Sequence, residues 1–563
     1  MEIYLSPRDE RQDGYPPGGR ARVRDVDPAA IPVATLQRHG GRVLRPTEAP
    51  RAAGTAAPLA TAYHAGSLLI PHGLVDQHTA GRLNEVLGPA GFGVAAPLPL
   101  DRIDAGLARA GSTLADLPRR FPIRVPDGAV PTRVDAWTAL ARLRAAASPD
   151  GPVHPELAGQ AHLEHLLIGS AVAGLGTGLH GAPVVEGSPV VEGSGGITSY
   201  TRPGYGGRSP VDLALAAPPR RPLSATGLGR RPVVAVLDTG IAAHPWLDVP
   251  VPGQPLPADG FVTVDRRLQD AIRAEQRELA AAGTPVEILE DPWDGPAVAD
   301  PLLGELDTHV GHGTFIAGLV RQIAPDAQVR AIRIMHSDGV VYEADLLLAL
   351  ATIAARVAAA QEGVGDPADL VDVVCLSLGY FAERPAPELY TGALAALIDR
   401  LRGLGVLVVT AAGNYATSRE FFPAALAGRP PDGIDVPLLS VGALNPNGTI
   451  ALFSDQAPWV RWWATGAALV STFPRVQGSL SAAVEVPPNG FRRRATLDAD
   501  DFSSGFAVWS GTSFAAPVVA ANVAAALIAG AQERPDLRLD RTEPKAATAR
   551  ITAALARVTG GRA

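Results

Sequence analysis

Short apolar runs separated by helical stretches dominate the second half of the chain. These runs are four to six residues long and predict buried strands at 233–237, 329–334, 371–376, 406–410 and 438–441. Apolar residues at helical spacing lie between them. This alternation is typical of an α/β domain in which a parallel sheet is covered by helices on both faces. Ligands of such domains bind beyond the carboxyl ends of the strands.

The first half of the chain shows a different pattern, which predicts a small α+β domain at 61–150. Residues 1–60 are rich in Pro, Gly and Arg and lack periodicity, so we expect them to be extended or poorly ordered. Within 61–150, strands are predicted at 67–70, 92–97 and 121–125, and amphipathic helices at 75–87 and 132–147.

Residues 151–230 are interpreted as a helix followed by a Gly/Pro-rich linker. The helix is predicted at 155–170 and carries His162 and His165. Because neither has a partner at convincing metal-ligand spacing, we interpret them as surface or internally hydrogen-bonded histidines. Two consecutive copies of PVVEGS follow at 183–194. Two short copies are too few for a solenoid, so we expect an exposed linker.

The α/β domain is predicted to span 231–563. A long insertion follows its first strand and contains a charged helix at 265–282, interpreted as a solvated surface helix in preference to a functional lid. The single cysteine, Cys375, lies in the 371–376 strand. One cysteine excludes an internal disulfide, and its apolar surroundings predict a buried, unreactive thiol.

Composition narrows the possible partners. With 563 residues, 47% hydrophobic and 19% charged, the chain has room for two or three globular domains. A formal net charge of -8 without a basic cluster argues against a nucleic-acid partner. Residues 1–14 are polar and lack the apolar core of a secretory signal, and no apolar run approaches the length of a membrane span. We therefore expect a cytoplasmic protein without a membrane partner.

Ser513 lies at the start of a predicted helix. The sequence WSGTSFAAP at 509–517 places it after a Gly-Thr turn and before the apolar run 518–529. Backbone N–H groups at the first turn of a helix are unsatisfied and favour negative charge, so an oxyanion could develop there. Taken alone, the motif is equally an ordinary N-cap.

Two other polar residues have comparable positions. Asp238 follows the 233–237 strand and precedes Thr-Gly, and His312 lies in GHGTFIAG at 311–318, where a glycine turn opens a predicted helix. An acid, a histidine and a serine, each beside a glycine turn, form the set that nucleophilic acyl transfer needs.

Together these motifs resemble those of the subtilisin-like serine peptidases, over residues 232–530. The resemblance implies a subtilisin-like fold, in which Asn414 donates its side-chain amide to the oxyanion. It also implies a substrate-pairing strand and a pocket for the residue before the scissile bond, formed by Ser377, Leu378, Gly379, Ala411, Ala412 and Gly413. Phe421 follows where the family often has a glycine at the pocket base, which predicts a narrowed pocket. No calcium loop is readable, and we expect no metal or other cofactor.

The predicted function is that of a serine endopeptidase acting on a protein or peptide substrate. Asp238, His312 and Ser513 would form the triad and an acyl-enzyme intermediate, and the N-terminal region would regulate the enzyme. That region is similar to inhibitory prodomains, but an unrelated accessory domain is an open alternative. A non-catalytic peptide-binding protein of the same fold is the alternative function. An esterase is a third, although a backbone-pairing Ser-Leu-Gly strand suits an extended peptide better.

Overall fold

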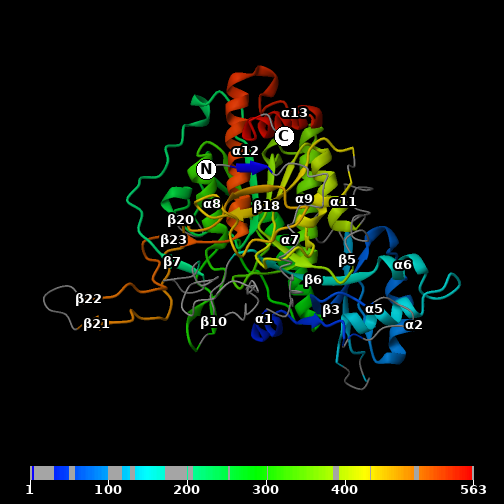
Figure 1. Ribbon diagram of the computed structural model, residues 1–563. Helices are drawn as coiled ribbons and strands as arrows, with labels where there is room; N and C mark the ends of the chain where they lie inside the picture. Colours follow the sequence, from blue (N-terminus) through cyan, green and yellow to red (C-terminus); the bar gives the residue numbers. More distant parts are fainter. Residues whose placement is uncertain are drawn as a thin grey trace, which may run out of the picture.

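Figure 1 shows the computed structural model, in which an α/β body lies beside a smaller N-terminal region. The structure describes residues 3–5, 31–47, 49, 57–98, 117–126, 128, 133–171, 200, 207–250, 254–300, 302–384, 392–430, 433–486 and 494–560. The repeat at 183–194 lies outside the described residues.

The α/β body is built on an eight-stranded sheet with the order β1-β19-β18-β16-β14-β8-β12-β9. Neighbouring strands are parallel except β1, which runs antiparallel to β19 at one edge. The predicted parallel sheet is therefore confirmed. The strands are β1 (Ile3–Leu5), β8 (Val233–Asp238), β9 (Val262–Val264), β12 (Gln328–Arg333), β14 (Val373–Leu376), β16 (Leu407–Ala411), β18 (Leu438–Leu444) and β19 (Trp462–Thr465).

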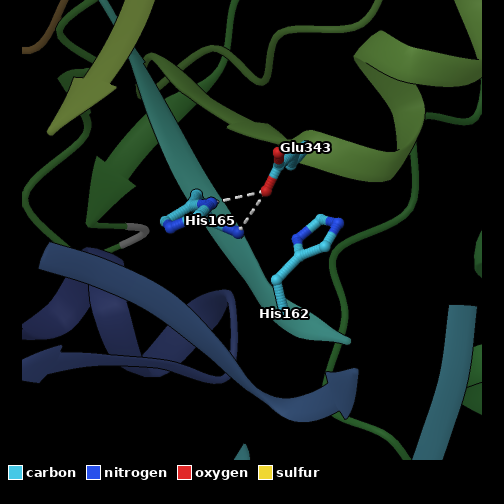
Figure 2. A group of neighbouring side chains, drawn as sticks. All are labelled: His162, His165 and Glu343. Atoms are coloured by element: carbon cyan, nitrogen blue, oxygen red, sulfur yellow. Dashed lines mark hydrogen bonds and ion pairs between the residues drawn. The ribbon is translucent and has the colours of Figure 1, made fainter. Parts of the chain in front are cut away.

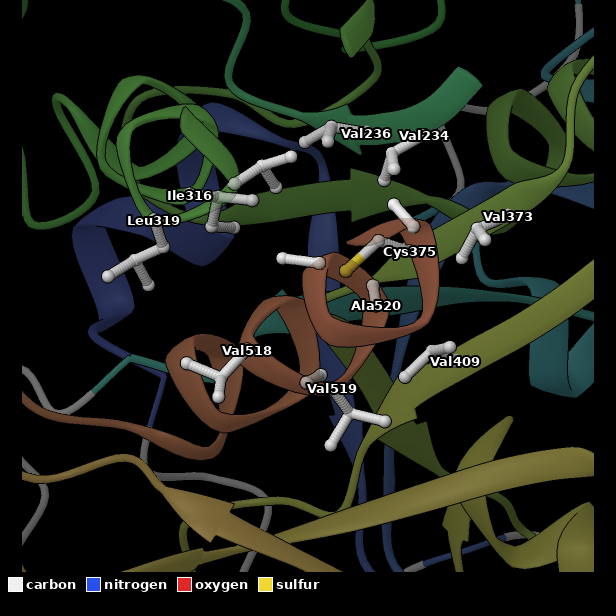
Figure 3. Packing of buried hydrophobic residues seen from close by; sticks show 14 of the residues in the cluster. Val234, Val236, Ile316, Leu319, Val373, Cys375, Val409, Val518, Val519 and Ala520 are labelled. Carbon is white, nitrogen blue, oxygen red and sulfur yellow. The ribbon is translucent and has the colours of Figure 1, made fainter. Parts of the chain in front are cut away.

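Each face of this sheet packs against its own pair of helices. Along β8, Val234 and Val236 belong to the hydrophobic cluster that includes α8 (His312–Ile323) and α12 (Thr512–Glu533). Figure 3 shows this cluster, in which apolar side chains of α12 lie among those of the strands. The alternate residues of β8 join a second cluster with α9 (Glu343–Gln361) and α11 (Ala393–Gly403). Helices on both faces are thus confirmed, because side chains alternate across a strand.

The helix α12 corrects one expectation from the sequence. Among the described helices it alone is long and apolar enough to cross a membrane, whereas no such run was expected. However, 78% of its most apolar window is buried inside the protein, against β14, β16, β18 and β19. The apolar composition of α12 is therefore that of a core helix, which is in contact with the rest of the protein on most sides.

The charged helix predicted at 265–282 is α7 (Arg266–Ala281). Asp265 caps it by accepting a hydrogen bond from the Leu268 N–H at 3.0 Å. Leu268, Ile272 and Leu279 are buried on one side, while its charged residues are largely exposed on the other. The helix is therefore solvated on one face and packed against the body on the other.

A second sheet carries the N-terminal region and extends into the α/β body. Its main path is β17-β15-β6-β3-β5-β4, with β2 paired to β3 and β13 paired to β6. Residues 1–60 were expected to be extended or poorly ordered, yet α1 and β2 form there because β3 supplies a pairing partner. The elements are α1 (Val33–Arg38), β2 (Gly41–Leu44), β3 (Thr61–Pro71), α2 (Thr79–Leu87), β4 (Gly93–Val94), β5 (Pro118–Arg124), α5 (Ala136–Ala145), β13 (Val340–Tyr342), β15 (Leu378–Phe381) and β17 (Phe421–Phe422).

The helix predicted at 155–170 is wrong beyond its first turns. The structure has a short helix, α6 (Pro155–Gln160), followed by a strand, β6 (His162–Gly169). The first part of β6 pairs with β3, and its last residues lie between β13 and β15, antiparallel to both. Partner strands far away in the sequence therefore override the local helical pattern.

The remaining elements lie outside the two large sheets, although β20, β23 and α13 contribute buried side chains to the core around α12. A three-stranded sheet joins β20, β23 and β7, and two small hairpins and a C-terminal helix complete the described fold. These elements are β7 (Arg208–Pro210), β10 (Val298–Asp300), β11 (Glu305–Leu306), β20 (Leu469–Thr472), β21 (Glu485–Val486), β22 (Arg494–Ala495), β23 (Phe506–Trp509) and α13 (Pro544–Val558).

Candidate active site

Asp238 and His312 meet at the carboxyl edge of the main sheet. Asp238 is the last residue of β8, which lies between β12 and β14, and His312 is the first residue of α8. His312 Nδ1 and Asp238 Oδ1 are 2.7 Å apart, and the Thr239 N–H donates to the same oxygen at 2.8 Å. Because Asp238 Oδ1 also accepts the Thr239 N–H, it acts as an acceptor here, so Nδ1 carries the hydrogen of this contact and Nε2 is left with a lone pair.

Asp294 ties together the two turns that carry this pair. Its carboxylate accepts hydrogen bonds from the Gly311 N–H at 3.1 Å, the Thr239 hydroxyl at 3.1 Å and the Thr314 hydroxyl at 3.0 Å. Burial raises the pKa of Asp294 to about 6. Asp294 therefore fixes the backbone turns on either side of the pair. Among the described contacts, it does not touch the imidazole of His312.

Ser513 is the second residue of α12, and it is fully buried beside the same edge. Its hydroxyl donates to the carbonyl oxygen of Ser377 at 3.0 Å, while the Ser377 hydroxyl donates to the Ser513 carbonyl at 2.9 Å. His312 Nε2 is buried and has no hydrogen-bond partner among the described residues. The serine hydroxyl is thus turned away from the histidine in this structure.

Asn414 and Ser513 converge on one carbonyl oxygen. Asn414 Oδ1 accepts from the Thr512 N–H at 2.9 Å and from the Thr512 hydroxyl at 2.8 Å, which fixes the orientation of the amide. The Asn414 Nδ2 group then donates to the carbonyl oxygen of Ser170, and the Ser513 N–H donates to the same oxygen at 3.0 Å. Two donors aimed at one oxygen beside a serine hydroxyl have the geometry of an oxyanion hole.

The strand β6 pairs with β15 and leads directly to Ser170. Gly169 pairs with Leu378, and Ile168 pairs with Gly379, in the strand that the sequence predicted to bind substrate. The Ser170 N–H donates to the Ser377 carbonyl at 3.0 Å. Part of the N-terminal region therefore pairs, as an extended strand, with the segment that the sequence predicted to bind substrate, and its Ser170 carbonyl lies beside Ser513.

The segments that the sequence predicts to line the pocket lie around the Phe421 ring. Ala411 ends β16 and is followed by the buried Ala412 and by Gly413, whose φ is 113°. Added Cβ atoms would lie 2.4 Å from the Phe421 ring at Gly379 and 3.1 Å from it at Gly413. The ring therefore packs against both glycines and leaves little room between them.

Two histidines of β6 lie at the interface with the α/β body. Figure 2 shows His162 and His165 beside Glu343, close enough for a metal ion. However, His165 Nδ1 and Nε2 each lie 2.6 Å from a carboxylate, of Glu343 and Glu383 respectively. Burial alone would lower the pKa of His165, but the two carboxylates raise it to about 10. Both ring nitrogens of His165 are therefore engaged by carboxylates, and His165 is the internally hydrogen-bonded histidine that was expected.

A second buried ionic cluster joins the same two units. Arg120 of β5 contacts Glu164 of β6 and, at 3.1 Å, Asp345 of α9. Gln276 of α7 also donates to Asp345, at 2.6 Å. Burial raises the pKa of Asp345 to about 7, although Arg120 opposes this shift. The interface is therefore held by directional, charged contacts.

Three residues that build this site were missed in the sequence. Ser170 contributes a backbone carbonyl, which has no side-chain signature. Asp294 lies in the long insertion after the first strand, beyond the charged helix at 265–282, where no functional residue was expected. His309 precedes His312 by three residues and lies in van der Waals range of Gly169, so a second histidine in the same motif was a readable signal.

Comparisons with known proteins match the α/β body. A family model described as the subtilase family matches residues 229–558. Subtilisin BL of Lederbergia lenta is 26% identical over 274 residues, which are 46% of this chain and 72% of that protein. Serine protease AprX of Bacillus subtilis (strain 168) is 24% identical over 324 residues, which are 56% of this chain and 66% of that protein, just under two thirds.

A solved structure described as a cold adapted subtilisin-like serine proteinase covers 57% of this chain and 81% of its own, with 17% identity and a TM-score of 0.32. The family match supports serine peptidase activity at the level of the family. Because the family model spans more than half of the sequence, the chain belongs to the subtilase family.

Proposed function

We propose that the chain is a serine endopeptidase whose N-terminal region is its first substrate and its inhibitor. Asp238, His312 and Ser513 would form the triad, and the bond between Ser170 and Ala171 would be cut. The observation that carries this proposal is the Ser170 carbonyl, which accepts hydrogen bonds from both the Ser513 N–H and the Asn414 amide.

The reaction begins with a rotation of the Ser513 hydroxyl from the Ser377 carbonyl towards His312. His312 Nε2 takes the hydroxyl proton while Oγ bonds to the carbonyl carbon of Ser170. The two donors stabilise the resulting oxyanion, and Asp238 stabilises the imidazolium. The bond to the Ala171 nitrogen then breaks as that nitrogen receives the proton from His312. Water then attacks the acyl-enzyme: His312 takes a proton from the water and returns it to Ser513 Oγ as the ester bond breaks.

Inhibition follows from the same contacts. Between β13 and β15, β6 fills the position of an extended substrate, and the cluster around Arg120 holds it there. After cleavage the Ser170 carboxylate would still face the two donors. These contacts favour a prodomain over an unrelated accessory domain.

One observation favours the alternative, a non-catalytic peptide-binding protein. Ser513 Oγ is hydrogen-bonded to the Ser377 carbonyl, and His312 Nε2 lacks a partner among the described residues. A protein that remains in this arrangement would hold β6 without cutting it.

The test is hydrolysis of a denatured protein substrate by the full chain. Wild type is compared with Ser513→Ala and with Ser503→Ala, a matched change at an exposed serine. The proposal expects hydrolysis by wild type and Ser503→Ala only. Equal hydrolysis by Ser513→Ala, or no cleavage by wild type of either the added protein or its own chain, would overturn it.

A further inference from the structure

We propose that the active site selects glycine at the second residue before the scissile bond, and that His309 and Met335 enforce this choice. A small residue, Ser or Ala, would directly precede the scissile bond. The inference rests on the proposed function and names its substrate class: extended protein segments of the pattern apolar, any, Gly, small.

The first observation is the space around Gly169. A Cβ added to Gly169 would lie 2.7 Å from Cδ2 and 2.9 Å from Nε2 of His309, and 3.0 Å from the sulfur of Met335. Real Cβ atoms essentially never approach other heavy atoms more closely than 3.0 Å. Any side chain at this position would therefore have to displace the His309 ring.

The His309 ring is held on several sides. Nε2 lies 3.2 Å from the Gly169 carbonyl oxygen, and Nδ1 lies 2.9 Å from the Thr308 hydroxyl. Burial lowers the pKa of His309 to about 3, so the neutral ring donates from Nε2 and accepts at Nδ1. A Cβ on Gly339 would lie 2.4 Å from Nδ1, which shows how closely that backbone approaches the ring.

The strand cannot move outward to make room. The Gly169 N–H donates to the Gly339 carbonyl at 2.9 Å, while its carbonyl accepts from His309. The next residue, Ser170, is fixed at both ends. Its N–H donates to the Ser377 carbonyl, and its carbonyl accepts from the Ser513 N–H and the Asn414 amide. Moving Gly169 away from His309 would therefore pull the reacting carbonyl out of register.

The pocket for Ser170 sets the second requirement. Ser170 is buried, and its hydroxyl has no hydrogen-bond partner in the part of the chain that the structure describes. The Phe421 ring, packed against Gly379 and Gly413, closes the pocket to larger side chains. Because a buried hydroxyl without a partner is costly, alanine should be accepted at least as well as serine.

The positions further from the bond complete the pattern. Leu167 is fully buried, whereas Ile168 is partly exposed and so tolerates other side chains. The sequence repeats this arrangement at 185–188 and 191–194, both reading Val-Glu-Gly-Ser, outside the described residues. With Val-Gln-Gly-Ser at 476–479, four segments of the chain thus have an apolar residue two positions before Gly-Ser.

The experiment measures kcat/KM of the full chain for decapeptides with the sequence of residues 165–174, HLLIGSAVAG. Replacing the glycine by alanine should lower kcat/KM about 10- to 100-fold, because overpacking a closed site is costly. Replacing the serine by alanine should leave it equal or higher, and replacing it by leucine should lower it about 10-fold or more.

The enzyme variant His309→Ala shows whether His309 is the cause. Its ratio of kcat/KM for the Gly and Ala peptides should fall below about 10. A general loss of activity cancels in this ratio, so a merely structural effect of the variant would not change it. Gly and Ala peptides cut at similar rates by wild type, or a ratio unchanged in His309→Ala, would overturn the inference.

Hydrolysis of the denatured protein separates the two proposals. If wild type digests it through Ser513 but does not discriminate between the decapeptides, the specificity inference falls and the proposed function stands. If no Ser513-dependent cleavage of these two substrates or of the chain itself occurs, both fall.

Discussion

The core of the α/β body and its interface with the N-terminal region are both buried, but in different ways. Around β8, contacts are apolar, as between Val236 and the helices α8 and α12. At the interface, Arg120, Glu164 and His165 are buried together with their carboxylate and guanidinium partners. Apolar packing is non-directional, whereas buried ion pairs are costly unless their geometry is right.

This difference indicates that the core determines where the site residues lie and that the interface determines the register of β6. The apolar core stabilises the sheet that brings Asp238, His312 and Ser513 to one edge. The ionic interface fixes how β6 lies on that edge. A slip of one residue would turn every side chain of β6 to the opposite face and remove the Ser170 carbonyl from its two donors. We infer that the buried charges hold this register.

The largest predicted effect is loss of the docked β6 in Glu343→Ala, made in a Ser513→Ala background to prevent cleavage. Removing one carboxylate leaves the buried His165 cation with one partner, and breaking a buried pair costs about 3–5 kcal/mol. Hydrogen exchange of the 166–169 amides should accelerate about 10²–10³-fold, while α12 stays protected.

The matched control is Glu278→Ala, at an exposed position of α7. It should leave the exchange of β6 unchanged. Equal protection of β6 in Glu343→Ala would show that the ion pairs do not hold the strand.

The variant Asn414→Ala should change the rate of self-cleavage without changing how tightly β6 is docked. Loss of one oxyanion donor should slow self-cleavage about 10²–10³-fold, because that donor acts mainly on charge developed in the transition state. Protection of β6 should change little, since its backbone pairing to β13 and β15 remains. Time courses of intact mass measure the rate, with the exposed Asn447→Ala as control. An unchanged rate would remove Asn414 from the oxyanion hole.

In the core, Leu401→Ala should lower the free energy of unfolding by about 2–5 kcal/mol. Leu401 is fully buried on α11 in the second hydrophobic cluster. Denaturant unfolding in the Ser513→Ala background measures this change, and Leu215→Ala, at a residue 69% exposed, should be near neutral. If Leu401→Ala accelerated hydrogen exchange in β6 without lowering the free energy of unfolding, the proposed separation of roles between core and interface would be wrong.

The last prediction is a dependence of β6 docking on pH. His165 faces Glu343, Glu383, His162 and the stacked ring of Tyr380. Its pKa is raised from 6.5 to about 10, so its stabilisation of docking is complete below pH 6.5 and is lost as pH rises through about 10.

Opening of β6 should therefore increase with pH in this window, by at most about tenfold per pH unit for one proton. Hydrogen exchange, corrected for its intrinsic pH dependence, measures the opening in the Ser513→Ala chain. The added variant His165→Gln should flatten the profile. Opening that decreases between pH 6.5 and 10 would contradict the assigned role of His165.

The sequence predicted the α/β body well because its signals are local. β8 and β14 are apolar runs, and Asp238, His312 and Ser513 stand at element ends beside glycines. Burial on both faces leaves a continuous apolar pattern that needs no knowledge of partners.

The interface was not predictable in the same way. β6 was predicted as a helix because its partners, β3, β13 and β15, are distant in the sequence. The part that Ser170 plays depends on its backbone carbonyl, which any residue carries. The charges at Glu343 and Glu383 gave no periodic signal, since each contacts His165 from a different element.

The most direct test of the account is the intact mass of the purified full chain over time, for wild type beside Ser513→Ala. We predict that wild type separates into fragments 1–170 and 171–563, with Ala171 as the new N-terminal residue, and that Ser513→Ala stays whole. Cleavage of both proteins at that bond, or a first cut by wild type at another bond, would contradict the claim that β6 presents Ser170 to Ser513.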